Sequence, residues 1–147
     1  ALPLICDPSY RFELGKAAML HPGTDASILA TGIMVGKAVE AAKSLANEGI
    51  GCRVINISTI KPIDENTVIA CARETGAIVT AEEHLEHGGL GSIVARLVSQ
   101  RHPVPMSMVA IDDVYSPSGE ADELLELRGL TVDRIEREVR DLVNRKS

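Results

Sequence analysis

The sequence predicts an α/β domain with a mostly parallel sheet. Short apolar runs alternate along the chain with longer segments whose apolar residues recur at helical spacing, which is the order that parallel α/β folds show. The runs consist mainly of Val, Ile, Leu and Ala, and aromatic residues make up only 2% of the 147 residues. Aliphatic side chains suit the closely packed layers of a sheet that helices cover on both faces.

The start of the chain predicts a linker followed by one strand of unusual direction. Residues 1–12 contain two prolines and no sustained periodicity, so we expect a linker there and a domain over residues 13–147. A strand is predicted at 13–20 and a second at 27–31. The turn between them, HPGTD at 21–25, is too short for a crossover helix. Within one sheet these strands must run antiparallel or be splayed apart, so we expect a mixed sheet.

The rest of the chain predicts alternating helices and strands. Asp64 is a good N-cap residue, and Ile63 and Val68 have the spacing of a hydrophobic staple. The predicted elements are a helix over 32–48, a strand over 52–58, a helix from 64 to 76, a strand over 77–81, a helix after Gly91 that ends near Arg101, a strand over 106–111, a helix over 120–127, and a final helix capped by Thr131.

Composition excludes several classes of function. The formal charge of −6 does not fit a nucleic-acid-binding surface, and no run reaches the roughly 20 apolar residues of a membrane span. Three cysteines, Cys6, Cys52 and Cys71, have no metal-ligand spacing and indicate reduced thiols. We therefore expect a cytoplasmic protein without a nucleic-acid or membrane partner.

One stretch, residues 77–98, holds the best candidate site. An apolar strand runs into the sequence EEHLEH at 82–87, and a glycine-rich segment then leads into an amphipathic helix. In parallel α/β sheets, ligands bind beyond the carboxyl ends of the strands. The candidate residues, for an interface or an anion contact, are Glu82, Glu83, His84, His87, Gly88, Gly89 and Gly91.

Several chemistries are possible at this stretch. A metal site would need a second cluster of ligands, which the sequence lacks. The glycines could expose N–H groups to an anion or only permit a tight turn, and both interpretations stay open. The nearest following cation is Arg96.

Two other motifs do not match. The segment GIMVGKA at 32–38 fails the spacing of a phosphate-binding loop. Ser92 lacks the following glycine that a nucleophile elbow requires.

Four ordered segments resemble the C-terminal domain of transketolase-like thiamine diphosphate enzymes. They are DASILATGIMVGKAVEAA at 25–42, INISTIKPIDE at 55–65, TAEEHLEHGGLGSIVA at 80–95 and SGEADELLELRGLT at 118–131. The EEH version and the RGLT tail look most like transketolases whose second half is a separate subunit. The resemblance implies a three-layer α/β/α sandwich with a mixed five-stranded sheet whose first strand is antiparallel.

The resemblance also implies a role in a larger enzyme. Such enzymes transfer a two-carbon ketol unit between sugar phosphates, and their thiamine diphosphate and divalent metal bind to a GDG motif in another domain. This sequence has no GDG motif. We therefore expect a non-catalytic domain without its own cofactor, which packs against a pyrimidine-binding domain and a cofactor-binding domain or subunit in a homodimer or heterotetramer.

The family resemblance leaves alternatives. The domain could come from deoxyxylulose phosphate synthase or from the beta subunit of a 2-oxoacid dehydrogenase. It could also be a free-standing module that binds an anion or a nucleotide through its glycine-rich helix start.

Overall fold

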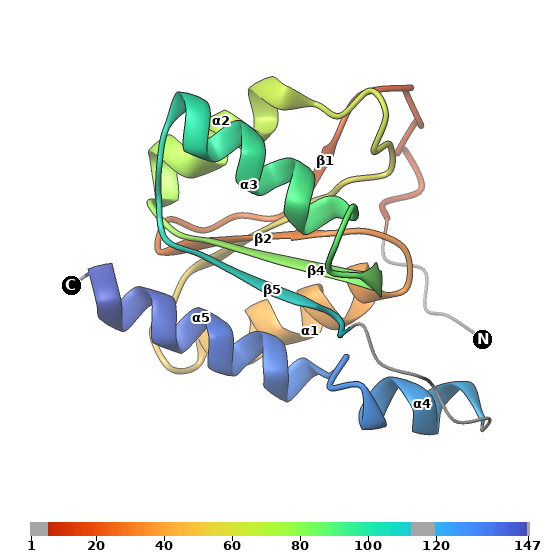
Figure 1. Cartoon of the computed structure of the whole chain (residues 1–147). Helices are drawn as coiled ribbons and strands as arrows, with labels where there is room; N and C mark the ends of the chain where they lie inside the picture. The colour runs from red at the N-terminus through yellow and green to blue at the C-terminus, as the bar shows by residue number, and fades with distance from the viewer. Residues whose placement is uncertain (1–5, 113–119, 147) are drawn as a thin grey trace.

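A computed structural model describes residues 6–112 and 120–146. A five-stranded sheet lies between two layers of helices (Figure 1), as the family resemblance implies. The strands are β1 (Ala18–His21), β2 (Ala26–Ala30), β3 (Cys52–Asn56), β4 (Ile78–Leu85) and β5 (Met106–Ile111). The helices are α1 (Met34–Ala46), α2 (Glu65–Thr75), α3 (Leu90–Arg101), α4 (Ala121–Leu127) and α5 (Val132–Lys146). No helix within the described ranges is both long and apolar enough for a membrane span.

The sheet is mixed, with strand order β1-β3-β2-β4-β5. Strand β1 runs antiparallel to β3, whereas β3, β2, β4 and β5 are mutually parallel. The predicted direction of the first strand is therefore confirmed. Its neighbour is β3 rather than β2, so the short turn after β1 passes the start of β3.

Gly23 permits this passage. A Cβ atom at Gly23 would lie 2.2 Å from the carbonyl carbon of Cys52, because the two backbones are in direct contact. Backbone and side-chain bonds hold the crossing: Asp25 N donates to Gly51 O at 2.9 Å, and Gly51 N donates to the Asp25 carboxylate at 2.7 Å.

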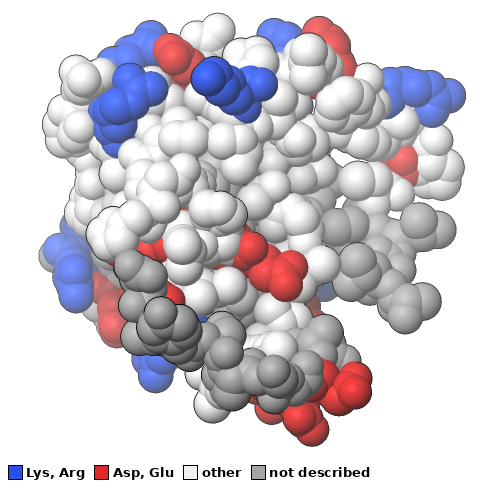
Figure 2. Space-filling view, turned by 45° about the vertical axis from the view of Figure 1, so that its right-hand side comes forward, with Lys and Arg blue, Asp and Glu red and all other residues white. Residues whose placement is uncertain are grey.

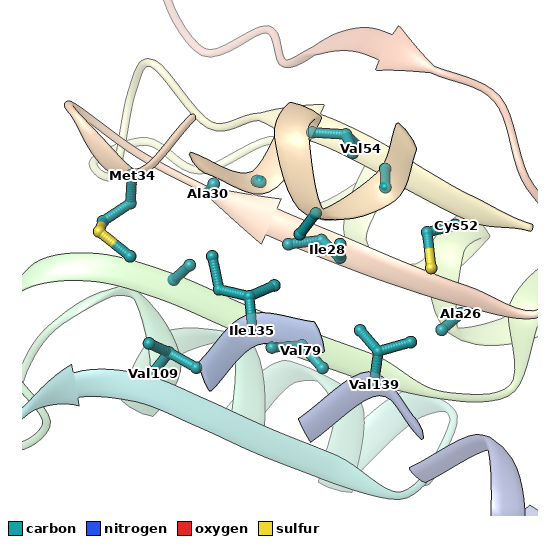
Figure 3. Packing of buried hydrophobic residues seen from close by; sticks show 14 of the residues in the cluster. Ala26, Ile28, Ala30, Met34, Cys52, Val54, Val79, Val109, Ile135 and Val139 are labelled. Carbon is teal, nitrogen blue, oxygen red and sulfur yellow. The ribbon is translucent and has the colours of Figure 1, made fainter. Parts of the chain in front are cut away.

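The two faces of the sheet carry separate cores. Helices α1 and α5 pack on one face against alternate residues of β2, including Ile28, and Figure 3 shows this cluster. Helices α2 and α3 pack on the other face, against residues such as Leu29 and Ile55. All five residues of β2 are buried, as expected for a central parallel strand covered on both sides.

The predicted strand over 13–20 is wrong at its start, because only Ala18–His21 is extended. Residues 13–16 form a turn in which Gly15 has a φ of +75°. The backbone N–H groups of Gly15 and Ala17 donate to the side chains of Thr59 and Asp64. They therefore bind the loop that follows β3 and not a neighbouring strand.

The predicted end of the fourth strand at Ala81 is also wrong. Strand β4 continues to Leu85, and the start of the predicted polar turn is extended backbone. The continuation follows β5: Leu85 pairs with Ile111 after a shift of register, and Glu86 N donates to Ile111 O at 3.1 Å. Pairing with β5 thus keeps this segment extended, although its residues are polar.

Other local predictions are confirmed. Asp64 caps α2 by accepting from Thr67 N, and α2 ends at Gly76 with a φ of +68°. Thr131 accepts from Arg134 N at the start of α5. Cys52 and Cys71 are buried free thiols. Burial is the main cause that raises the pKa of Cys52 to about 12, and the nearby Asp25 carboxylate adds to it.

Two predicted segments lie partly outside the described part of the chain. They are the turn at 112–119, of which residues 113–119 are not described, and the linker, of which residues 1–5 are not described.

Candidate functional site

The candidate site lies at the carboxyl edge of the sheet, between the ends of strands β2 and β4. Strands β2 and β4 are neighbours, but the helices that follow them, α1 and α3, cover opposite faces. Such a switch point leaves a crevice between the two strand ends. Here it is a hollow of about 420 Å³, lined by Thr31, Gly32, Ile60, Glu82, Glu83, His84, Gly88 and Gly89.

Glu82 is the buried centre of this edge, with 1% of its surface exposed. Its Oε1 atom accepts from Leu90 N at 2.8 Å, and its Oε2 atom accepts from Gly91 N at 2.8 Å. A carboxylate at this position satisfies N–H groups of the first turn of α3 and interacts favourably with the helix dipole. The N–H groups that an external anion would use here already bind the protein's own carboxylate.

Gly89 and Gly91 allow this close approach. A Cβ atom at Gly89 would lie 2.0 Å from Glu82 Oε1, and one at Gly91 would lie 2.7 Å from the sulfur of Met108. Gly88 differs from them, since its φ of +83° requires glycine-like freedom while the space around it is open. Gly89 and Gly91 thus serve packing, and Gly88 serves the turn.

The remaining predicted residues lie on the surface of the turn. Glu83, His84 and His87 are exposed, and His84 Nδ1 lies 3.0 Å from the carbonyl oxygen of Leu85. The hydroxyl of Ser92 donates to Glu86 O at 2.7 Å and accepts from Gly88 N at 3.1 Å. That hydroxyl therefore braces the turn. The structure brings the predicted residues together at one edge, but only Glu82 has a buried side chain among them.

The hollow is acidic. Its lining residues include two glutamates and no Lys or Arg. Figure 2 shows acidic side chains near the centre of the face that is turned toward the viewer, with basic ones mainly toward its margins. Within the described residues, no group of three or more His, Cys, Asp or Glu side chains could hold a metal ion.

A second groove adjoins the first, and both include Ile60. It has a volume of about 290 Å³ and is lined by Ile60, Lys61, Pro62, Ile63, Glu65, Ile93 and Arg96. This groove was not predicted as a site, although the sequence marks Arg96 as the cation nearest to the glycines. The residues come from the loop after β3, from the first position of α2 and from α3, and their proximity depends on the packing of α2 against α3.

The family model for "Transketolase, C-terminal domain" matches residues 15–135 of the chain. One similar curated protein is the 6-deoxy-6-sulfo-D-fructose transketolase subunit of Clostridium sp. (strain MSTE9), which is 46% identical over 136 residues. That match covers 92% of this chain and 42% of the relative. The 1-deoxy-D-xylulose-5-phosphate synthase of Heliobacterium modesticaldum is 39% identical over 132 residues, or 89% of this chain and 20% of the relative.

A solved structure described as a split-gene transketolase, in an inactive beta4 tetramer, has the same fold. Its TM-score to this chain is 0.90 at 43% sequence identity, and the match covers 97% of this chain and 47% of that one. The chain therefore spans less than half the length of these relatives.

Proposed function

The chain belongs to the transketolase C-terminal domain family, and from that premise we propose that it is the C-terminal domain of a larger ketol-transferring enzyme. The observation that carries the proposal is the family match over residues 15–135. All four segments that suggested the family lie wholly within this range. The larger enzyme would transfer a two-carbon ketol unit between sugar phosphates.

We propose that thiamine diphosphate and its divalent metal bind outside this chain. The residues of the switch-point hollow do not fit a diphosphate, because Glu82 occupies the N–H groups of Leu90 and Gly91. The hollow also presents no cation to phosphate oxygens, and acidic side chains repel them. The chain alone should therefore not catalyse ketol transfer, and it contributes packing and assembly.

We further propose that the turn over residues 82–91 contacts a neighbouring domain or subunit. Glu83, His84 and His87 are exposed beside a hollow at the edge of the sheet. The neighbour would be the pyrimidine-binding domain, or the cofactor-binding domain or subunit, within a homodimer or heterotetramer. The names of similar proteins, a transketolase subunit and a split-gene tetramer, support an assembly of this kind. Reduced buried thiols support a cytoplasmic location.

A reconstitution experiment tests the proposal. The chain is expressed alone, and also within the complete product of its gene together with any neighbouring transketolase-type subunit. Both samples are assayed for ketol transfer between sugar phosphates with thiamine diphosphate and Mg²⁺. Activity is expected only in the complete assembly. Transfer by the isolated chain, or none by a folded and complete assembly, would contradict the proposal.

A second candidate function follows from the match to a 1-deoxy-D-xylulose-5-phosphate synthase. The same complete assembly is assayed for formation of 1-deoxy-D-xylulose 5-phosphate. Formation of that product in place of ketol transfer would assign the domain to the synthase branch. The identity of 39%, against 46% for the transketolase subunit, favours the transketolase branch.

A further inference from the structure

The groove between the loop after β3 and helix α3 carries two cations without partners. Glu65, which also lines the groove, pairs with Arg101 at 3.0 Å. Lys61 and Arg96 are exposed, and within the described residues the side chain of neither takes part in a hydrogen bond or an ion pair. Three isoleucines, Ile60, Ile63 and Ile93, line the space around them. The groove is thus apolar with two positive charges that the domain does not neutralise.

The incoming chain is fastened to the same loop. Gly15 N donates to Thr59 Oγ1 at 3.2 Å, and Ala17 N donates to Asp64 Oδ2 at 3.0 Å. A Cβ atom at Gly15 would lie 3.3 Å from the ring of Pro62, which lines the groove. Figure 1 shows the red amino-terminal segment beside the loop that leads into α2. Chain that precedes residue 15 therefore leaves the domain next to this groove.

Large apolar side chains continue along that segment. Phe12 and Leu14 are 62% and 69% exposed, although both immediately precede the fastened residues. Two large apolar side chains exposed within three residues offer a surface on which another body can pack. A body that packs there would be near the point where the chain leaves the domain.

We propose that the preceding domain of the same polypeptide docks in the groove lined by Ile60, Lys61, Pro62, Ile93 and Arg96. The part that docks carries an acidic side chain beside an apolar one. The carboxylate pairs with Lys61 and Arg96, and the apolar side chain packs on the isoleucines. This inference rests on the proposed function, because it requires a preceding domain. It names a contact surface next to the turn at 82–91, with the opposite charge.

The covalent connection makes such a contact effective. Because the linker holds the preceding domain close to this docking site, the effective concentration of that domain is high. A contact of low intrinsic affinity is then enough to keep the two domains docked. Complementary charges then set the orientation of the two domains. The acidic hollow and the cationic groove meet at Ile60, which gives the carboxyl edge two adjoining surfaces of opposite sign.

Hydrogen exchange of the loop amides tests the proposal. The complete gene product is compared with the isolated chain at Ile60, Lys61 and Ile63. Protection at least about tenfold greater is expected in the complete polypeptide, since a docked domain shields the loop. The double reversal Lys61→Glu with Arg96→Glu should remove that protection. Exchange that is equal in both polypeptides, or protection that survives the double reversal, would overturn the proposal.

The control keeps the change of charge and moves it to the opposite face of the sheet. Lys43 and Arg137 are exposed on α1 and α5, so Lys43→Glu with Arg137→Glu should retain the protection. All four substituted positions are exposed, and the isolated variants should keep the far-UV circular dichroism of the wild type. Loss of protection in this control as well would contradict a contact specific to the groove.

Two other occupants have distinct signatures. If 10 mM inorganic phosphate protects the loop of the isolated chain as strongly as the complete polypeptide does, the groove is a small-anion site and the proposal fails; that concentration is about tenfold above a millimolar dissociation constant. If protection of the isolated chain rises with its concentration, the occupant is a second copy and the proposal also fails. Ketol transfer is measured on the same samples, so an active assembly with an unprotected loop refutes only this inference.

Discussion

Helices α2 and α3 lie side by side on one face of the sheet, and each begins with a carboxylate that accepts from its first N–H groups. In α2 the carboxylate is local: Asp64 accepts from Thr67 N at 3.1 Å. In α3 it comes from the preceding strand: Glu82 accepts from Leu90 N and Gly91 N, eight and nine residues further along. Asp64 is partly exposed, whereas Glu82 is buried.

The difference between the two caps has a structural meaning. The Asp64 cap stabilises its own helix and holds Ala17 of the incoming chain. The Glu82 cap ties β4 to α3 across the turn and occupies the positive end of the helix, which lies at the switch point. The Asp64 cap thus helps to attach the incoming chain. The Glu82 cap occupies N–H groups that could otherwise bind an external anion.

Removal of the buried cap should have the largest effect. Glu82→Ala leaves two buried N–H groups without an acceptor, and we expect a loss of about 3–5 kcal/mol in the free energy of unfolding. Urea denaturation followed by circular dichroism measures it. Glu82→Gln keeps the size and one acceptor oxygen and should lose less, about 1.5–3 kcal/mol. A Glu82→Ala variant within 0.5 kcal/mol of wild type, below the ordinary cost of one lost hydrogen bond, would contradict this account.

Crowding of the same carboxylate should have the next largest effect. Gly89→Ala places a Cβ atom 2.0 Å from Glu82 Oε1, so the cap must move, at a cost of about 2–4 kcal/mol. Thermal and urea denaturation measure the change. Because Gly89→Ala acts through Glu82, its cost should shrink in the Glu82→Ala background.

Gly49 offers a contrasting substitution, because Gly89 has a φ of −86° and a close contact, whereas Gly49 has a positive φ and open space. Its φ of +82° resembles that of other turn glycines, but no atom lies near its Cβ position. Gly49→Ala should therefore cost only about 1 kcal/mol, from backbone conformation alone. Strict additivity of Gly89→Ala with Glu82→Ala would show that the two sites act independently, against the geometry described.

Loss of the local cap should cost less than loss of the buried one. Asp64→Ala removes the acceptor for Thr67 N and Ala17 N, and about 1–2 kcal/mol is expected. Chemical denaturation measures it, and Asp64→Asn, a good cap without charge, should restore part of the loss. A cost for Asp64→Ala that exceeds the cost for Glu82→Ala would reverse the comparison between the two helices.

The dependence of the Asp64 contribution on pH should be the smallest of these effects. Burial acts to raise the pKa of Asp64, but hydrogen bonds from Ala17 and Thr67, helped by Lys16, outweigh it and lower the pKa. The stability that the charged form contributes is present above the ordinary pKa of about 4 and is lost as the pH falls through the lowered value. The difference between wild type and Asp64→Ala should therefore narrow below about pH 4, as measured by urea denaturation at a series of pH values. A difference that is constant or widens with acid would contradict it.

The sequence allowed prediction of what depends on near neighbours. The Asp64 cap, the glycine end of α2 and the antiparallel first strand follow from short spacings, and all three are confirmed. The length of β4 was missed, because its last residues are extended only through pairing with β5. The same holds for the start of β1, whose neighbours along the chain bind a loop that is more than 40 residues away in sequence.

The candidate site shows the same limit. Proximity in sequence grouped Glu82 with Glu83 and His84, yet the start of α3 holds Glu82 inside and the other two side chains are exposed. Nothing local distinguishes the three side chains. The groove with Lys61 and Arg96 combines residues 35 positions apart, and only the packing of two helices unites them.

The crossing at Gly23 has a consequence for the order in which the chain becomes structured. Strand β1 has β3 as its sheet neighbour, so its hydrogen-bond partners do not exist until Asn56 has been synthesised. The loop that fastens Gly15 and Ala17 is made later still, at Thr59 and Asp64. During vectorial synthesis, any domain that precedes this one has emerged and can fold before its anchor is formed. The first strand in sequence thus waits for the third strand before it can pair, and the setting of the two domains is fixed only after the loop before α2 has been made.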